Sequence, residues 1–151
     1  MSYSITLHLL AAVIWVGGMI FAHAVLRPSA VQVLEPPLRL ELWVQVFRRF
    51  FVFVWISIGL ILISGYWMLF NYFGGFQGAG LHIHIMHGGG IFMVFIYLHV
   101  FFSPYRRLKQ AVIVQDYPLA GAQLNQIRKL VGINILLGLL VIIIGSAGRY
   151  I

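Results

Sequence analysis

The chain has 151 residues, of which 62% are hydrophobic and 9% are charged, with a formal net charge of +7 and a mean hydropathy of +0.98. A soluble globular domain carries about 25% charged residues. This composition therefore excludes an ordinary soluble fold and predicts one integral membrane domain over residues 1–151. The sequence contains no cysteine, which excludes disulfides, thiolate zinc sites, iron–sulfur clusters and covalently attached c-type haem.

Four apolar segments are each long enough to cross a bilayer, which takes about 20 residues. The first lacks a basic leader and a small-residue cleavage pattern, so we expect it to be retained rather than removed as a signal peptide. None of the segments alternates polar and apolar residues as a barrel strand does. We therefore predict an all-α fold, an up-down bundle of four membrane-spanning helices. The predicted spans are residues 5–26, 50–70, 81–103 and 130–148.

The loops that precede the second and fourth spans carry helix-start signals. Two prolines, Pro36 and Pro37, precede the stretch LRLELWVQVFRR, which we interpret as an interfacial helix or an extension of the second span. Asp116 followed by Pro118 is typical of an N-cap with proline in the first turn. We expect one helix to run from about residue 118 through the fourth span.

Nine of the ten basic residues fall in the two loops that follow the first and third spans. By the positive-inside rule these loops face the cytoplasm, which places both termini in the periplasm of a bacterial inner-membrane protein. The positive charge is then explained by topology and anionic lipid, and nucleic acid is not an expected partner. The nine residues are Arg27, Arg39, Arg48, Arg49, Arg106, Arg107, Lys109, Arg128 and Lys129.

Six histidines lie in or beside two of the spans. An ionisable side chain within a span indicates a functional site by default, although a single histidine more often caps a helix or bonds across the bundle. We interpret His82, at the membrane interface, in that structural way. The first span carries His8 and His23, and the third carries His84, His87 and His99.

The spacing of these histidines is the same on both helices. His8 and His23 are fifteen residues apart, as are His84 and His99, which corresponds to about 22 Å of rise along a helix. The first and third spans run in the same direction and face each other diagonally across an up-down bundle. We therefore predict two levels of facing imidazoles: His8 with His84 or His87 near the outer surface, and His23 with His99 near the inner surface.

Two such levels are typical of two stacked b-type haems, each with two axial histidines. Arg27 and Arg106 at the inner rim and Arg149 at the outer rim are candidates to pair with propionates. On this hypothesis the protein is a membrane cytochrome, a candidate oxidoreductase that transfers electrons across the membrane. The expected partners are membrane lipid, a quinone or quinol and a periplasmic redox partner, with homo-oligomerisation left open.

Three stretches, HLLAAVIWVGGMIF running on to VLRP, SPYRRL and QIRKLVGINILLGLLV, resemble the CopD-like family of small membrane proteins. The resemblance covers essentially the whole chain and implies a role in copper resistance or uptake. His8, Trp15 and Gly18 also resemble the opening of the HemJ-type protoporphyrinogen oxidases, which are four-helix haem proteins. That family places a lysine two residues after a histidine at the start of its third helix, where this chain has His84 after His82, or Gly89 after His87.

Three functions therefore stay open: a two-haem cytochrome, a copper transport or resistance protein, and a HemJ-like porphyrin oxidase. Soft thioether and imidazole groups suit Cu(I), although methionine at helical spacing is more often a packing residue. A catalytic pair of carboxylates within the membrane is excluded, because the three acidic residues lie in loops. The methionines available to copper are Met19, Met68, Met86 and Met93.

Overall fold

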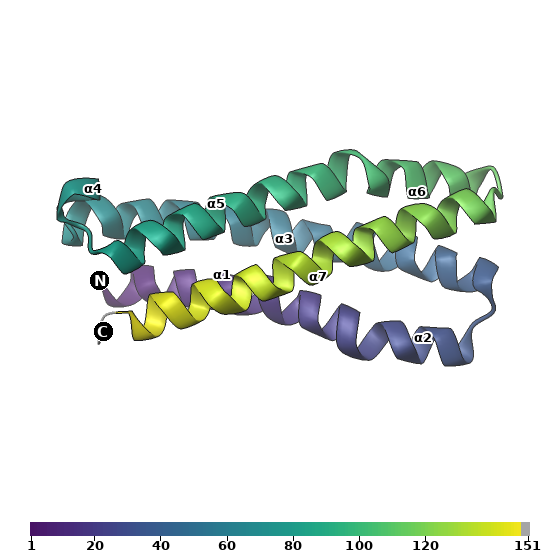
Figure 1. Cartoon of the computed structure of the whole chain (residues 1–151), viewed down its shortest axis with the longest axis horizontal. Helices are drawn as coiled ribbons and strands as arrows, with labels where there is room; N and C mark the ends of the chain where they lie inside the picture. The colour runs from purple at the N-terminus through teal and green to yellow at the C-terminus, as the bar shows by residue number, and fades with distance from the viewer. Residues whose placement is uncertain (149–151) are drawn as a thin grey trace.

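The computed structural model describes residues 1–148, which form helices joined by short turns and contain no strand (Figure 1). Four helical stretches in this range are long and apolar enough to cross a membrane, which confirms the predicted all-α membrane fold. The elements are α1 (Ser2–Ile20), the π-helix η1 (Phe21–Leu26), α2 (Arg27–Val33), α3 (Pro36–Tyr72), α4 (Gly75–Gly78), α5 (Leu81–Phe102), α6 (Pro104–Ile113) and α7 (Tyr117–Ala147).

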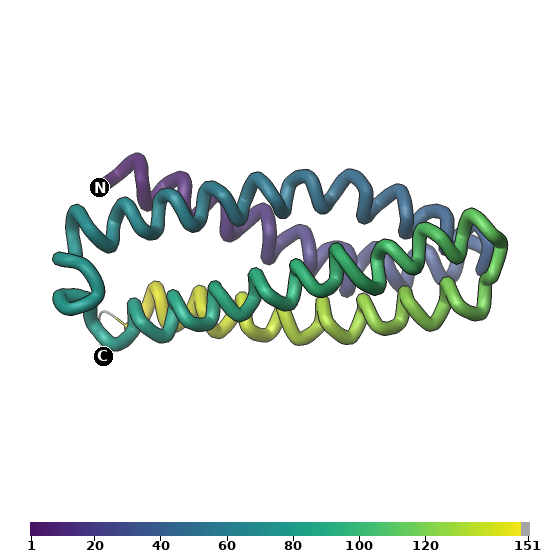
Figure 2. The backbone as a smooth tube through the Cα atoms, turned by 90° about the horizontal axis from the view of Figure 1, so that it is seen from above, coloured from purple at the N-terminus to yellow at the C-terminus, as the bar shows by residue number. Residues whose placement is uncertain are grey.

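The helices form an elongated bundle with two different ends. We call the end where α1 begins and α7 ends the termini end, and the opposite end, with α2 and α6, the basic end (Figure 1). Helix α1 packs along α3, while α5 and α6 pack along α7. The backbones of α1 and α5 make little contact with each other, as expected for the diagonal pair. Figure 2 shows the bundle from above, with α3 on one side and α7 on the other.

Two helices extend well beyond the predicted spans. Helix α3 runs without a break for 37 residues from Pro36, so the stretch after the two prolines is an extension of the second span. Helix α7 begins at Tyr117 and continues to Ala147, which confirms the single helix expected there. The Asp116 side chain accepts a hydrogen bond from the backbone N–H of Leu119 at 3.1 Å, which confirms the predicted N-cap.

Four short elements were not predicted: η1, α2, α4 and α6. Helix α5 ends at Phe102 because Pro104 has no backbone N–H and restricts the residue before it. The chain then forms α6, whose buried side includes Tyr105 and Leu108. The turn between α3 and α4 uses Gly74 and Gly75, with φ of 70° and 76°, a backbone region that glycine enters without steric cost.

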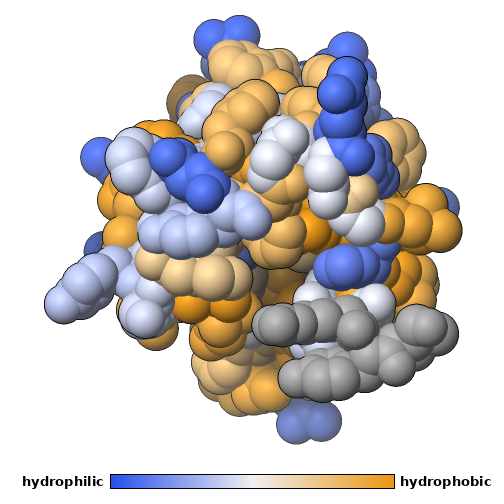
Figure 3. Space-filling model, turned by 90° about the vertical axis from the view of Figure 1, so that its left-hand side faces the viewer, coloured by the Kyte–Doolittle hydropathy of each residue, from blue (hydrophilic) through white to orange (hydrophobic). Residues whose placement is uncertain are grey.

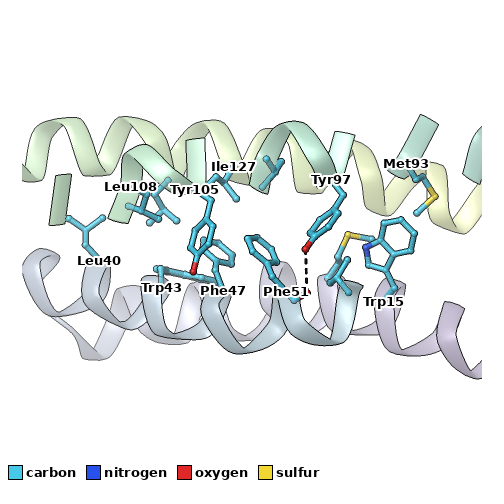
Figure 4. Close-up of a cluster of buried hydrophobic side chains, with 14 of the residues drawn as sticks. Trp15, Leu40, Trp43, Phe47, Phe51, Met93, Tyr97, Tyr105, Leu108 and Ile127 are labelled. Atoms are coloured by element: carbon cyan, nitrogen blue, oxygen red, sulfur yellow. Dashed lines mark hydrogen bonds between the residues drawn. The ribbon is translucent and has the colours of Figure 1, made fainter. Parts of the chain in front are cut away.

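The best-packed core lies in the basic half of the bundle and is built from aromatic rings (Figure 4). Phe51 is central to it: its ring centroid is 4.9 Å from that of Tyr105 and 5.4 Å from that of Tyr97, both edge-on. The Tyr97 hydroxyl donates to the Phe51 carbonyl at 3.3 Å. Phe47 stacks on Phe51, and Trp43 extends the row toward the basic end.

The flanks of the bundle are apolar and turned outward. In the most hydrophobic window of each spanning stretch, only 11–28% of the residues are buried inside the protein, so lipid must cover the rest. Figure 3 looks onto the termini end and shows hydrophilic residues gathered at this end, with hydrophobic residues among and behind them. The spanning helices therefore contact membrane lipid.

Candidate functional site

A cavity of about 120 Å³ lies among α1, α3, α5 and α7 in the termini half of the bundle, and we call it the central cavity. Its walls are mostly apolar. His8 lines it from α1, Tyr66 from α3 and His87 from α5, and each of these rings carries a polar group. Two sulfur-bearing side chains, Met86 and Met93 of α5, line the same space.

His8 is half-buried and anchored to α3. Its Nδ1 lies 3.1 Å from the Ser64 hydroxyl oxygen, and that hydroxyl donates its own proton to the Leu60 carbonyl. Because a serine hydroxyl has one proton, its oxygen accepts from His8 Nδ1–H. The lone pair of the imidazole is then on Nε2, the arrangement in which a buried histidine can ligate a metal. The space for the ring comes from Gly65, where an added Cβ would lie 3.2 Å from His8 Cε1.

His87 is half-buried and is held by the same helix. The Tyr66 hydroxyl lies 2.9 Å from His87 Nε2, so a phenol two residues after Ser64 on α3 bonds the second imidazole. Phe76 of α4 packs edge-on against the His87 ring with centroids 5.2 Å apart. Both imidazoles of the central cavity are thus positioned by hydroxyl groups of α3.

His84 lies outside the central cavity. It is exposed on the first turn of α5, and its Nδ1–H donates to the Gly80 carbonyl at 3.1 Å. Of the two alternatives predicted for the outer level, the structure brings His87 into one cavity with His8 and leaves His84 at the helix end.

The inner pair is placed differently. His23 lies in the π-helix η1, where it is half-buried with Cε1 3.7 Å from the position a Cβ would take at Gly132 of α7. His99 is exposed on α5. A smaller cavity of about 30 Å³ in this part of the bundle is lined by neither of them. The pairing of His23 with His99 stays a prediction.

The arginines predicted to bind propionates also differ in their surroundings. Arg27 is half-buried at the start of α2. Arg106 is exposed on α6, with its guanidinium 5.7 Å from the Phe102 ring centroid. Arg149 lies outside the described residues.

Among the methionines, Met86 and Met93 line the central cavity, whereas Met19 lies against the smaller one.

The groups at the central cavity that could bind a metal are two imidazoles, two thioethers and the Tyr66 phenol, with no carboxylate. Within residues 1–148 no group of three or more histidine, cysteine, aspartate or glutamate side chains is placed to hold a metal. A ligand here would therefore be bound by the histidine pair with help from sulfur. Neutral nitrogen and soft sulfur donors suit Cu(I), and imidazole alone also suits haem iron.

Sequence reasoning identified His8 and His87 but missed the two residues that orient them. Ser64 and Tyr66 stand in the apolar second span without any periodic pattern around them. The available signal was their chemistry: hydroxyl groups inside a span need a partner, and histidines on neighbouring helices can supply one.

Comparison with known proteins connects the chain to one family. No curated protein and no solved structure matches it significantly. The family model CopD, described as copper resistance protein D, matches residues 44–147, which is more than half of the chain. This range includes His87, and His8 precedes it. The match and the four spanning helices agree with a multi-pass protein of the inner membrane. The chain belongs to the CopD family.

Proposed function

We propose that this protein handles copper within the membrane and binds Cu(I) in the central cavity. The observation that carries the proposal is that His8 and His87 line one cavity together with Met86 and Met93. The family match, to copper resistance protein D, supports copper as the metal.

The chemistry of the cavity favours a soft monovalent ion. Its walls are apolar and offer no carboxylate, so a divalent cation would lose hydration without gaining a negative partner. Cu(I) carries a single charge and is well matched by imidazole nitrogen and thioether sulfur. His8 presents its Nε2 because Ser64 holds its Nδ1–H. His87 would contribute its Nε2 once the Tyr66 hydroxyl gives way.

The position of the cavity sets the side from which copper would enter. The nine basic residues lie toward the basic end, which the positive-inside rule places in the cytoplasm. The central cavity is then in the periplasmic half of the bilayer, and Phe76 of α4 stands between His87 and that surface. We propose that Cu(I) arrives from the periplasm and that His8 and His87 are the first pair to hold it.

A Cu(I) titration of the purified protein against a chromophoric Cu(I) chelator tests the proposal. We expect one tightly bound Cu(I) per chain, and a loss of affinity of at least about a hundredfold in His8→Ala and in His87→Ala, because each removes a ligand. His84→Ala is the matched control: it removes an imidazole three residues away that lies outside the cavity. Equal losses in all three variants, or none, would contradict the proposal.

Haem b at the same two histidines is the second candidate. The observation that favours it is that the two imidazoles reach one cavity from two separate helices, α1 and α5. Two axial histidines on separate helices are a usual ligand set for b-type haem iron. In that case a quinol and a periplasmic redox partner would supply and remove electrons.

The absorption spectrum of the protein as purified from cells separates the two candidates. Copper binding predicts colourless Cu(I)-loaded protein with copper and no iron. Haem binding predicts a red protein with iron and an intense porphyrin band that His8→Ala and His87→Ala abolish and His84→Ala keeps. A porphyrin band that survives in the first two variants would rule out haem at this cavity.

A further inference from the structure

Three of the nine basic residues toward the basic end differ from the others in their burial. Arg27 at the start of α2, Arg39 on α3 and Arg128 on α7 are each half-buried. The remaining six are exposed, as solvated charges at a membrane surface normally are. They are Arg48, Arg49, Arg106, Arg107, Lys109 and Lys129.

The three half-buried arginines converge although they come from three helices. His23 of η1 packs against the Gly132 position of α7, and these two segments run in opposite directions. Arg27 is four residues after His23, and Arg128 is four residues before Gly132. Because the two segments are antiparallel, both steps lead toward the basic end and bring Arg27 level with Arg128. Helix α3, which carries Arg39, contacts both α2 and α7, and the positive charges of Arg27 and Arg39 lie near enough to disfavour a charge on Arg128.

The cluster has no buried carboxylate beside it, because Glu35, Glu41 and Asp116, the three acidic residues of the chain, are all exposed. Both charges that act on Arg128 are positive, and Asp116 is engaged at the N-cap of its own helix. Arg128 Nε is buried and has no hydrogen-bond partner. One turn along α3 from Arg39, the indole Nε1 of Trp43 is a second buried donor without a partner, in a side chain that is 3% exposed.

Partly buried like charges beside an unpaired N–H donor favour the binding of an anion. Bringing three guanidinium groups together without one is unfavourable, because each loses hydration and repels the others. The donors present are all N–H groups, which match the oxygen atoms of a phosphate better than any cation or neutral ligand. A basic pocket between membrane helices on the cytoplasmic side is also where anionic lipid headgroups bind.

We propose that Arg27, Arg39 and Arg128 form a binding site for a phosphate group, supplied by the headgroup of an anionic phospholipid. The site joins α2, α3 and α7, so an occupied site would hold the basic end together. It depends neither on copper nor on haem in the central cavity.

The test measures lipid binding by the full-length protein in a neutral detergent. Phosphatidylglycerol is titrated while the thermal midpoint is followed, and native mass spectrometry counts the lipids retained. We expect phosphatidylglycerol to raise the midpoint and phosphatidylcholine to leave it unchanged. Arg128→Gln and Arg39→Gln should each weaken phosphatidylglycerol binding about tenfold, since each removes a charge-assisted hydrogen-bond donor. Arg107→Gln, exposed on α6 toward the same end, is the matched control and should keep wild-type binding.

Each outcome of the lipid-binding test either supports or contradicts the proposed phosphate site. If Arg107→Gln weakens binding as much as Arg128→Gln, the attraction is a diffuse surface effect and the site is wrong. Equal protection by phosphatidylcholine would also overturn it. Millimolar inorganic phosphate is the second arm: protection that depends on Arg39 and Arg128 supports the site and assigns it to a free anion instead of a lipid. Should Arg128→Gln fail to fold, the Arg39→Gln variant and the lipid selectivity of the wild type still either support or contradict the proposed site.

Discussion

In the basic half of the bundle, aromatic rings fill the space between the helices, whereas in the termini half the same helices enclose a cavity. Phe51 touches rings from α5 and α6 in the first region. In the second, His8 and His87 face an open volume lined by mostly apolar side chains. Trp15 lies between the two regions: it lines the central cavity and packs edge-on against Tyr97 with centroids 6.3 Å apart.

The difference separates stability from function within one bundle. Close packing of large rings contributes dispersion and hydrophobic free energy, so the basic half can fix the relative positions of the helices. The termini half then does not need a filled core, and polar groups can be presented to a ligand there. A packing defect should therefore cost stability in the basic half and ligand affinity in the termini half.

The largest effect is expected from Phe51→Ala. This change removes a ring that contacts several aromatic neighbours and leaves a cavity, so we expect the free energy of unfolding to fall by about 3–5 kcal/mol. Denaturant unfolding in detergent measures it. Phe53→Ala is the control, because Phe53 is two residues away on α3 and 56% exposed. Equal losses in the two variants would mean that the aromatic cluster is not the source of stability.

Replacing one alanine by leucine in each half compares the two halves directly. Ala111 is 1% exposed in the basic half, so Ala111→Leu should overpack the core and cost about 1–3 kcal/mol. Ala12 lines the central cavity, so Ala12→Leu should leave stability unchanged or raise it by about 0.5–2 kcal/mol. Cu(I) titration should show weakened binding only in Ala12→Leu. A strongly destabilised Ala12→Leu would show that the cavity is already full.

The two hydroxyl groups of α3 should act on Cu(I) affinity with opposite signs. Ser64→Ala removes the acceptor that holds His8 Nδ1–H, so we expect binding to weaken about tenfold. Tyr66→Phe removes a hydroxyl that occupies His87 Nε2, so binding should strengthen by about two- to tenfold. Chelator competition measures both. Weaker binding in Tyr66→Phe would mean that the phenol supports the ligand instead of competing with it.

The smallest effect is expected at the N-cap of α7. Asp116→Ala removes the side chain that accepts from Leu119 N–H, and loss of such a cap costs about 1 kcal/mol. Cu(I) affinity should be unchanged, because the cap lies in the loop at the basic end. Glu41→Ala, an exposed acidic residue on α3, is the control and should change neither quantity.

Much of the fold follows from hydropathy, and the exceptions have physical causes. The four spans and the extension of α7 from Asp116 were predictable, because apolar length and cap residues are local signals. Helix α6 was missed because Pro104 and the charges after it resemble a loop. The main core was missed because much of it lies outside the predicted spans, where Leu108 is 0% exposed. Within the spans, lipid takes the place of a buried core.

The site was predictable in part. Histidine spacing led to His8 and to either His84 or His87, and only the structure shows which of the latter reaches the cavity. The inner pair was derived from regular α-helical spacing, which the π-helix changes from Phe21 onward, and the pairing of His23 with His99 stays a prediction. Ser64 and Tyr66 were not predicted at all, since a single hydroxyl in an apolar span has no sequence pattern of its own.

Copper X-ray absorption spectroscopy of the Cu(I)-loaded protein tests the central claim most directly, because it reports the atoms bound to the metal. We predict scattering from two imidazole rings together with sulfur. His8→Ala and His87→Ala should each lose one imidazole contribution, and His84→Ala should keep both. A spectrum without imidazole scattering, or one that is identical in His8→Ala and wild type, would contradict copper binding in the central cavity.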